Sequence, residues 1–139
     1  MRRALKLLLP LLLLQVSCSR QKTITTDELR SELTSAVSLA AETETIIDYV
    51  VQHRLTHNYA LGHLGYLARE AQRSAKELDE ASPEPATEQK LAESKEQVAS
   101  LSKEIAAARA SMGNPEALAA TKQEIAHTRA AIEKVKASL

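Results

Sequence analysis

The chain has 139 residues, with 18 basic and 18 acidic side chains, and it contains neither Trp nor Phe. All of the acids lie beyond Cys18 and three of the bases precede it, so the chain from Cys18 onward has a net charge of −3. That acidity, without basic clusters interleaved with aromatic residues, excludes general nucleic-acid binding. Abundant Ala, Leu, Glu and Lys with only 3 Gly favour long helices over a thick globular core.

The first predicted element is a secretory signal over residues 1–17. Three basic residues lie near the start of the chain, and an apolar run from Leu7 to Leu14 follows them, interrupted only by Pro10. A short apolar run behind a basic end is typical of an export signal, and it is too short for a membrane-spanning helix. We therefore expect the remaining residues to be exported.

The segment LQVSC, residues 14–18, ends in the only cysteine of the chain and resembles the lipobox of bacterial lipoproteins. The resemblance is confined to the leader. It implies that Cys18 carries a lipid such as palmitate, that residues 18–25 form a tether, and that Ser19 directs sorting to the outer rather than the inner membrane. A lone cysteine in an exported chain has no internal disulfide to form, which favours this interpretation. Ordinary cleavage by signal peptidase after Ser17 or Cys18 is the alternative.

Apolar and small residues at alternating steps of four and three predict three helices, over about residues 26–81, 83–112 and 115–138. Short connectors predict that neighbouring helices are antiparallel. The fold class is therefore all-α, an antiparallel three-helix bundle over residues 26–139 with coiled-coil-like packing. The first seam contains Leu29, Leu33, Ala36, Ala40, Thr43, Ile47, Val50, Arg54, His57, Leu61, Leu64, Ala68, Ala71, Ala75 and Leu78. The second contains Leu91, Ser94, Val98, Leu101, Ile105, Ala108 and Met112, and the third contains Leu118, Thr121, Ile125, Thr128, Ile132, Val135 and Leu139.

Local signals mark the helix ends. Thr25 and Glu28 predict a capping box at the start of the first helix. The two prolines of residues 82–85 predict its end and the start of the second helix. The Gly-Asn-Pro run at residues 113–115 marks the end of the second helix and the start of the third. Gly113 is predicted to be left-handed at the end of the second helix, Asn114 to cap the third, and Pro115 to be its first residue.

The first helix is predicted to be about 84 Å long at 1.5 Å per residue, about twice the length of either later helix. Its first half would then overhang the bundle and present an unpartnered apolar surface. That predicted interaction surface consists of Leu29, Leu33, Val37, Ile47 and Val50. A break near residues 57–65 is the alternative. We favour the continuous helix because no Pro lies there and each Gly costs only about 1 kcal/mol.

His53 and His57 are spaced four apart and would project from one face of the continuous helix, as a metal-binding pair does. Neither an acidic residue nor a cysteine completes the set nearby on that face. We therefore expect no metal and no cofactor, and we interpret these histidines as polar residues at a helix crossing.

No catalytic motif is present, so we expect the protein not to be an enzyme. The favoured function is that of a non-enzymatic, lipid-anchored helical scaffold or adaptor of the bacterial cell envelope. It would face the periplasm and act through coiled-coil contacts with a second copy or with another envelope protein. One alternative is a periplasmic bundle that binds a metal or small ligand through His53 and His57. Another is a soluble secreted protein whose amphipathic helices bind lipid surfaces, which the lack of Trp and Phe disfavours.

Overall fold

The computed structural model describes residues 22–139, which form four α-helices and one short two-stranded bridge. The helices are α1 (Thr26–Val51), α2 (His57–Glu80), α3 (Glu88–Ala110) and α4 (Pro115–Ala137), and the strands are β1 (Thr23–Ile24) and β2 (Ser82–Pro83). The expectation of an all-α protein is confirmed. The predicted signal, Cys18 and the first part of the predicted tether lie outside the described residues.

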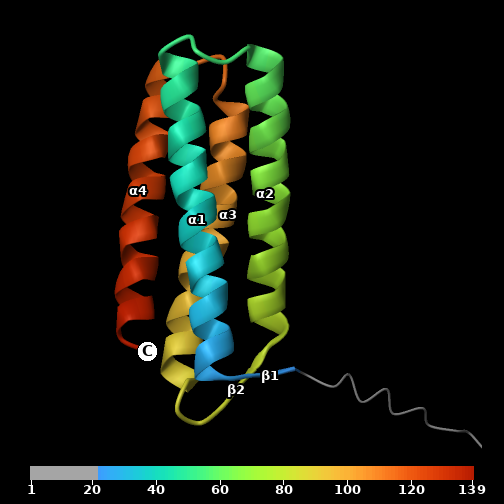
Figure 1. The fold of residues 1–139 in the computed structure, drawn as a ribbon, viewed down its shortest axis with the longest axis vertical. Helices are drawn as coiled ribbons and strands as arrows, with labels where there is room; N and C mark the ends of the chain where they lie inside the picture. The colour runs from blue at the N-terminus through green and yellow to red at the C-terminus, as the bar shows by residue number, and fades with distance from the viewer. Residues whose placement is uncertain (1–21) are drawn as a thin grey trace, which may run out of the picture.

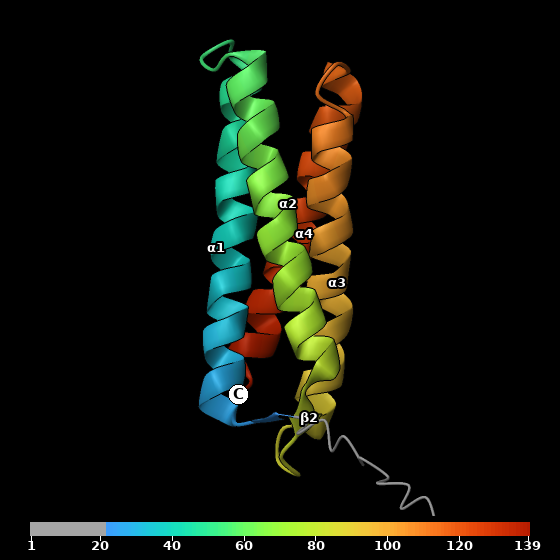
Figure 2. The same ribbon diagram turned by 90° about the vertical axis from the view of Figure 1, so that its right-hand side faces the viewer.

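The four helices run up and down in turn and make a rod (Figures 1 and 2). Helix α2 packs closely on α3, and α4 packs closely on both α1 and α3, whereas contacts between α1 and α2 are sparser. Residue 22 and the C-terminus lie at one end of the rod, which we call the base. The α1–α2 and α3–α4 connections lie at the opposite end (Figure 1).

The prediction of one continuous first helix over residues 26–81 is wrong, because the chain reverses between α1 and α2. His53 adopts a left-handed backbone conformation with φ of 55°. Its N–H donates to the Val50 carbonyl oxygen at 3.0 Å, and the Arg54 N–H donates to the Tyr49 carbonyl oxygen at 2.8 Å. These two hydrogen bonds and the left-handed residue constitute a Schellman motif, which satisfies carbonyl groups that the end of α1 leaves free.

The start of α2 is also fixed locally. Thr56 is extended, and its side chain accepts a hydrogen bond from the Tyr59 N–H at 3.4 Å, as an N-cap residue does. The break leaves helices of 26, 24, 23 and 23 residues, so that each helix has neighbours along its whole length. No helix is therefore twice as long as its neighbours, as the first helix of the predicted three-helix bundle would have been.

The predicted overhanging interaction surface is consequently part of the core. Leu29, Leu33 and Ile47 are fully buried within their own chain, and Val37 and Val50 pack partly buried against the core. The physical reason is the reversal after Val51, which folds α2 back along α1. The predicted seams hold in α1 from Leu29 to Ile47 and along α3 and α4, where their residues are buried apart from the half-buried Leu139. The continuation of the first seam is only partly correct, because Arg54 and His57 are exposed and α2 alternates buried and half-buried seam positions.

The capping box of α1 forms as expected. The Glu28 N–H donates to the Thr25 hydroxyl oxygen at 3.2 Å, and the Thr25 N–H donates to the Glu28 carboxylate at 3.0 Å. Asn114 caps α4 through the Ala117 N–H at 3.1 Å, with Pro at the first helical position. The expected left-handed Gly113 is not observed, because no glycine has a positive φ among the described residues.

The second predicted helix begins later than expected, at Glu88 rather than at residue 83. Pro83 instead pairs with Ile24 in the parallel bridge between β2 and β1, and the Ser82 N–H donates to the Lys22 carbonyl oxygen at 3.0 Å. The end of the predicted tether is thus part of the folded domain, where Ile24 is only 4% exposed.

Candidate functional site

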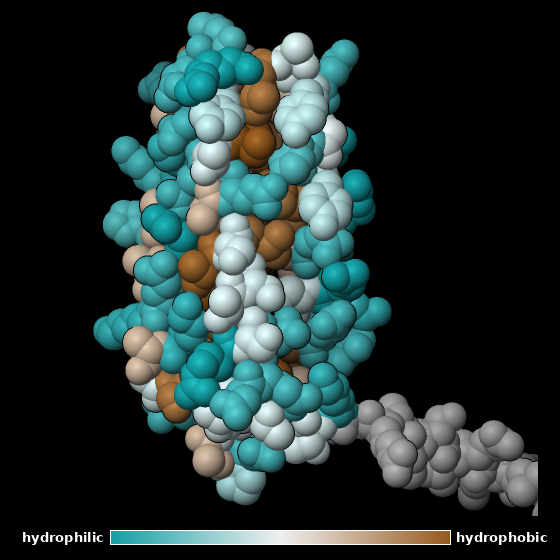
Figure 3. Space-filling view, in the orientation of Figure 1, coloured by the Kyte–Doolittle hydropathy of each residue, from teal (hydrophilic) through white to brown (hydrophobic). Residues whose placement is uncertain are grey.

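A groove of about 390 Å³ lies between α1 and α2, and we call it the α1/α2 groove. Its lining residues are Glu32, Thr34, Ser35, Ser38, Leu39, Glu42, Tyr66, Glu70, Arg73, Ser74 and Glu77. On the α1 side the lining includes three short hydroxyl side chains, Thr34, Ser35 and Ser38, which cannot interlock with α2 as larger apolar residues would. Apolar atoms are exposed along the line where α1 and α2 meet (Figure 3).

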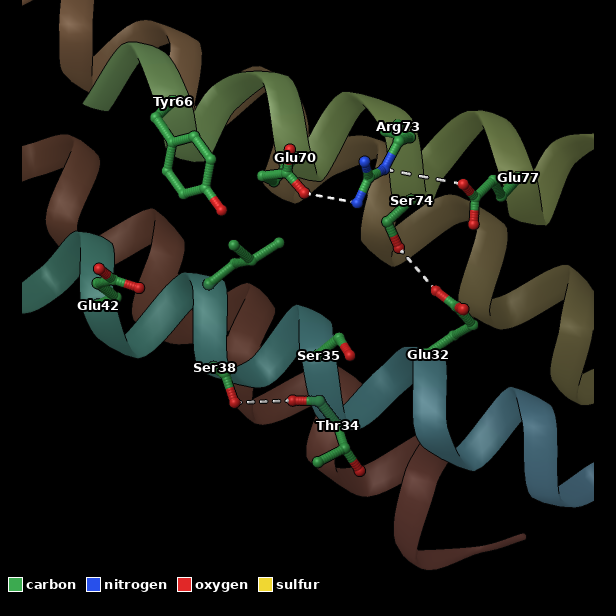
Figure 4. Close-up of a pocket in the computed structure, with 11 residues that line it drawn as sticks. Glu32, Thr34, Ser35, Ser38, Glu42, Tyr66, Glu70, Arg73, Ser74 and Glu77 are labelled. Atoms are coloured by element: carbon green, nitrogen blue, oxygen red, sulfur yellow. Dashed lines mark hydrogen bonds and ion pairs between the residues drawn. The ribbon is translucent and has the colours of Figure 1, made fainter. Parts of the chain in front are cut away.

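Polar contacts hold the part of the α1/α2 groove nearer the base in place (Figure 4). The Arg73 guanidinium lies 2.7 Å from the Glu70 carboxylate and 3.8 Å from that of Glu77. Across the groove, the Ser74 hydroxyl donates to the Glu32 carboxylate at 3.4 Å. The lining carries four glutamates against one arginine. The α1/α2 groove therefore has an acidic surface.

Three rings follow one another along α2 at the upper part of the groove, and we call them the tyrosine ridge: Tyr59, His63 and Tyr66. The Tyr59 and His63 rings stack with centroids 5.8 Å apart, and the His63 and Tyr66 centroids are 6.2 Å apart. Tyr59 is 55% exposed and Tyr66 is 49% exposed. His63 Nε2 lies 2.6 Å from a Glu42 carboxylate oxygen, which connects the ridge to α1.

The opposite seam of α1, against α4, is bridged by two ion pairs between charged side chains. Arg129 Nε lies 2.9 Å from a Glu44 carboxylate oxygen, and Lys122 Nζ lies 2.5 Å from one of Asp48. Within residues 22–139, α1 and α2 are joined by the hydrogen bond from Ser74 to Glu32 and by the contact between His63 and Glu42. Contacts between α1 and α2 are sparser than those between α1 and α4, and the half-exposed Tyr59 and Tyr66 belong to α2.

The two histidines considered as a metal pair do not lie on one helix. His53 belongs to the connection after α1 and His57 is the first residue of α2, and both are exposed. The left-handed backbone at His53 breaks the four-residue helical spacing that would have aligned the two rings. Within residues 22–139, no group of three or more His, Cys, Asp or Glu side chains could hold a metal ion.

All three tyrosines and three of the four histidines lie between residues 49 and 66 of the sequence, but the sequence does not indicate that Tyr66 lines a groove. Their helical spacing of four and three residues was a usable signal, since it places three rings on one face of α2. Which helix lies beside that face depends on the reversal at residues 52–56, and the sequence pattern did not reveal that reversal.

Comparisons with protein-family models, with curated proteins and with solved structures found no match for this chain. Over the described residues, none of the helices combines the length and the apolar character needed to cross a membrane. The site is therefore interpreted from its own residues.

Proposed function

We propose that the protein is a non-enzymatic, lipid-anchored adaptor of the bacterial cell envelope that faces the periplasm and holds a partner protein at the tyrosine ridge. The observation that supports this function best is the half-exposed Tyr66, which lines an open groove, together with the half-exposed Tyr59, which continues the same row of rings along α2. Tyrosine is enriched in protein interfaces because it offers a large rigid apolar ring and a hydroxyl that hydrogen-bonds at the rim.

The position of the first described residues supports the proposed lipid anchor. Residue 22 lies at the base of the rod, four residues after Cys18, and β1 is held there by its pairing with β2 (Figure 1). A lipid on Cys18 would therefore hold the base at the membrane surface. Helix α1, with 26 residues, would lift the opposite end by about 39 Å. The tyrosine ridge would then face the periplasm, away from the lipid.

The charge of the α1/α2 groove indicates what the partner surface offers. Glu32, Glu42, Glu70 and Glu77 outnumber Arg73, which is already paired with two of them. A partner with Lys or Arg side chains beside an apolar contact would complement this surface electrostatically. The partner is either a second copy of the chain or another envelope protein.

Two experiments test the anchor and the docking site separately. Cys18→Ser should move the protein from the membrane fraction to the soluble fraction, and a wild-type protein that is already soluble after export would refute the anchor. A photo-crosslinking phenylalanine analogue at Tyr66 should give a discrete adduct in living cells. The same analogue at Glu133, an exposed position on α4, is the control.

An adduct with twice the mass of the chain would identify a second copy as the partner, and any other discrete mass would identify a different protein. Equal crosslinking from both positions, or none from Tyr66, would refute docking at the tyrosine ridge. Because the crosslinks do not depend on Cys18, failure of the anchor and failure of the docking site can be told apart.

A further inference from the structure

A second groove, between α2 and α3, gathers cations that form no ion pair with a carboxylate of residues 22–139. Its volume is about 520 Å³, and we call it the α2/α3 groove. The residues that line it are Gly65, Ala68, Arg69, Gln72, Ala75, Ala99, Ser102, Lys103, Ala106 and Arg109. The lining contains three basic side chains and no acidic one. None of the ion pairs among the described residues involves any of these three.

This pattern differs from that of other bases in the bundle. Lys122 and Arg129 pair with acids of α1, and Arg73, on the neighbouring face of α2, lies between two glutamates. Arg69 and Lys103, by contrast, are exposed, and they come from the two helices that form the α2/α3 groove. Unneutralised charge of one sign along a recessed surface attracts a ligand of the opposite sign.

The third cation is positioned by a glycine. A Cβ atom added at Gly65 would lie 3.1 Å from Arg109 Nε, so the missing side chain makes room for Arg109 to lie against α2. There the Arg109 Nε–H donates to the Leu61 carbonyl oxygen at 3.4 Å. The guanidinium is thus held at the upper end of the α2/α3 groove.

The floor of the α2/α3 groove is made of small side chains. Ala68, Ala75, Ala99 and Ala106 line it together with Gly65. Small residues allow the backbone of a further helix to approach closely, because no long side chain keeps the helix axes apart. The α2/α3 groove also runs along the bundle axis, since α2 and α3 are antiparallel neighbours (Figure 2).

We propose that the α2/α3 groove docks an acidic α-helix of a partner protein, with its backbone over the alanine floor and its carboxylates paired with Arg69, Lys103 and Arg109. Lys103 and Arg109 are six residues apart on α3, a rise of about 9 Å. Carboxylates two helical turns apart on the docked helix match that separation. A helix packed into a groove between two helices is a common mode of peptide recognition.

Other anionic occupants match the α2/α3 groove less well. A single phosphate would need the cations to converge, whereas the backbone positions of Lys103 and Arg109 are separated by a rise of about 9 Å along α3 and Arg109 is directed to the Leu61 carbonyl oxygen. An anionic bilayer presents a broad flat surface, whereas the three cations line a recess between two helices. A narrow ligand that enters the α2/α3 groove can reach both the cations and the alanine floor.

The inference extends the adaptor function but does not depend on the lipid anchor or on the tyrosine ridge. The probe is a labelled alanine-based helical peptide with glutamates at positions i, i+3 and i+7, and its matched peptide has glutamines there. Fluorescence anisotropy at low salt should detect binding of the acidic peptide to the Cys18→Ser protein. Binding should weaken as salt is added, because exposed ion pairs are screened.

Two pairs of matched variants test the location. Arg69→Gln with Lys103→Gln should weaken binding at least tenfold, whereas Lys76→Gln with Lys136→Gln changes the net charge equally and should weaken it less than threefold. Ala106→Leu should fill the α2/α3 groove without changing charge and should also weaken binding at least tenfold. Ala107→Leu, exposed on the same helix but outside the groove lining, is its control.

Equal losses for both charge pairs, or no effect of Ala106→Leu, would mean non-specific attraction and would overturn the proposal. So would equal binding of the glutamine peptide, or binding of phosphatidylglycerol vesicles without binding of the acidic peptide. Sedimentation of the protein alone provides the last check. Self-association that Lys103→Gln abolishes would make a second copy, rather than another protein, the occupant.

Discussion

Replacing His53 with glycine should stabilise the protein, although glycine usually destabilises a helical protein. His53 is held at φ of 55°, where an L-residue suffers a steric cost of roughly 1–2 kcal/mol that glycine avoids. Glycine loses more backbone entropy on folding, which offsets about 0.5–1 kcal/mol of that gain. The His53 side chain is exposed, so its removal sacrifices little packing. We expect a net gain of about 0.5–1 kcal/mol in the free energy of unfolding.

Urea unfolding of the Cys18→Ser protein, followed by circular dichroism, measures this difference as a higher midpoint with an unchanged slope. Gln52→Gly is the matched control, because Gln52 precedes His53 and has an ordinary φ of −81°. That variant should lose stability. If residues 26–81 formed one helix, both glycines would lie in a helix interior and both would destabilise it. Equal losses would therefore refute the Schellman reversal and the four-helix fold.

Three further predictions concern the core, the start of α1 and the histidines. Leu33→Ala should lower the free energy of unfolding by about 2–5 kcal/mol in urea titrations, because Leu33 is fully buried. The Thr25 backbone N–H and the Lys22 ammonium lower the pKa of Glu28 from its ordinary 4.5. Its stabilising effect is thus present above pH 4.5 and lost as the pH falls through the folded-state pKa, so thermal melts of Glu28→Gln should converge with wild type in acid. Calorimetric titration with zinc should show no stoichiometric binding, and submicromolar binding abolished by His57→Ala would contradict this.

The sequence was sufficient for the buried faces of α3 and α4 and for two of the helix caps. Heptad spacing located the buried side of α3 and α4 residue by residue, and the Thr25–Glu28 and Asn114 caps were predicted because each needs only neighbouring residues. The reversal after α1 was missed because His53 occupies a left-handed position where glycine is the usual signal. Gly62 and Gly65, which drew attention as possible break points, both lie inside α2.

The two grooves could not be predicted by the same means. Arg69 and Lys103 belong to different helices, and their common groove exists only because α2 packs on α3. The tyrosine ridge borders α1 only because α1 ends at Val51 and α2 returns beside it. Surface sites of this kind follow from the order in which helices neighbour one another. The misplaced end of α1 hid the α1/α2 groove, whereas the α2/α3 groove depends on which side chains of two neighbouring helices face a common recess.

The parallel bridge between β1 and β2 has a mechanical consequence. A pull on the chain ahead of Lys22 would first load the hydrogen bond from the Ser82 N–H and the buried Ile24 side chain, before it reached the first turn of α1. Part of that tension would be diverted into the connection between α2 and α3, on the other side of the base. The bridge would therefore carry part of the force, and it would protect the first turn of α1 from unfolding.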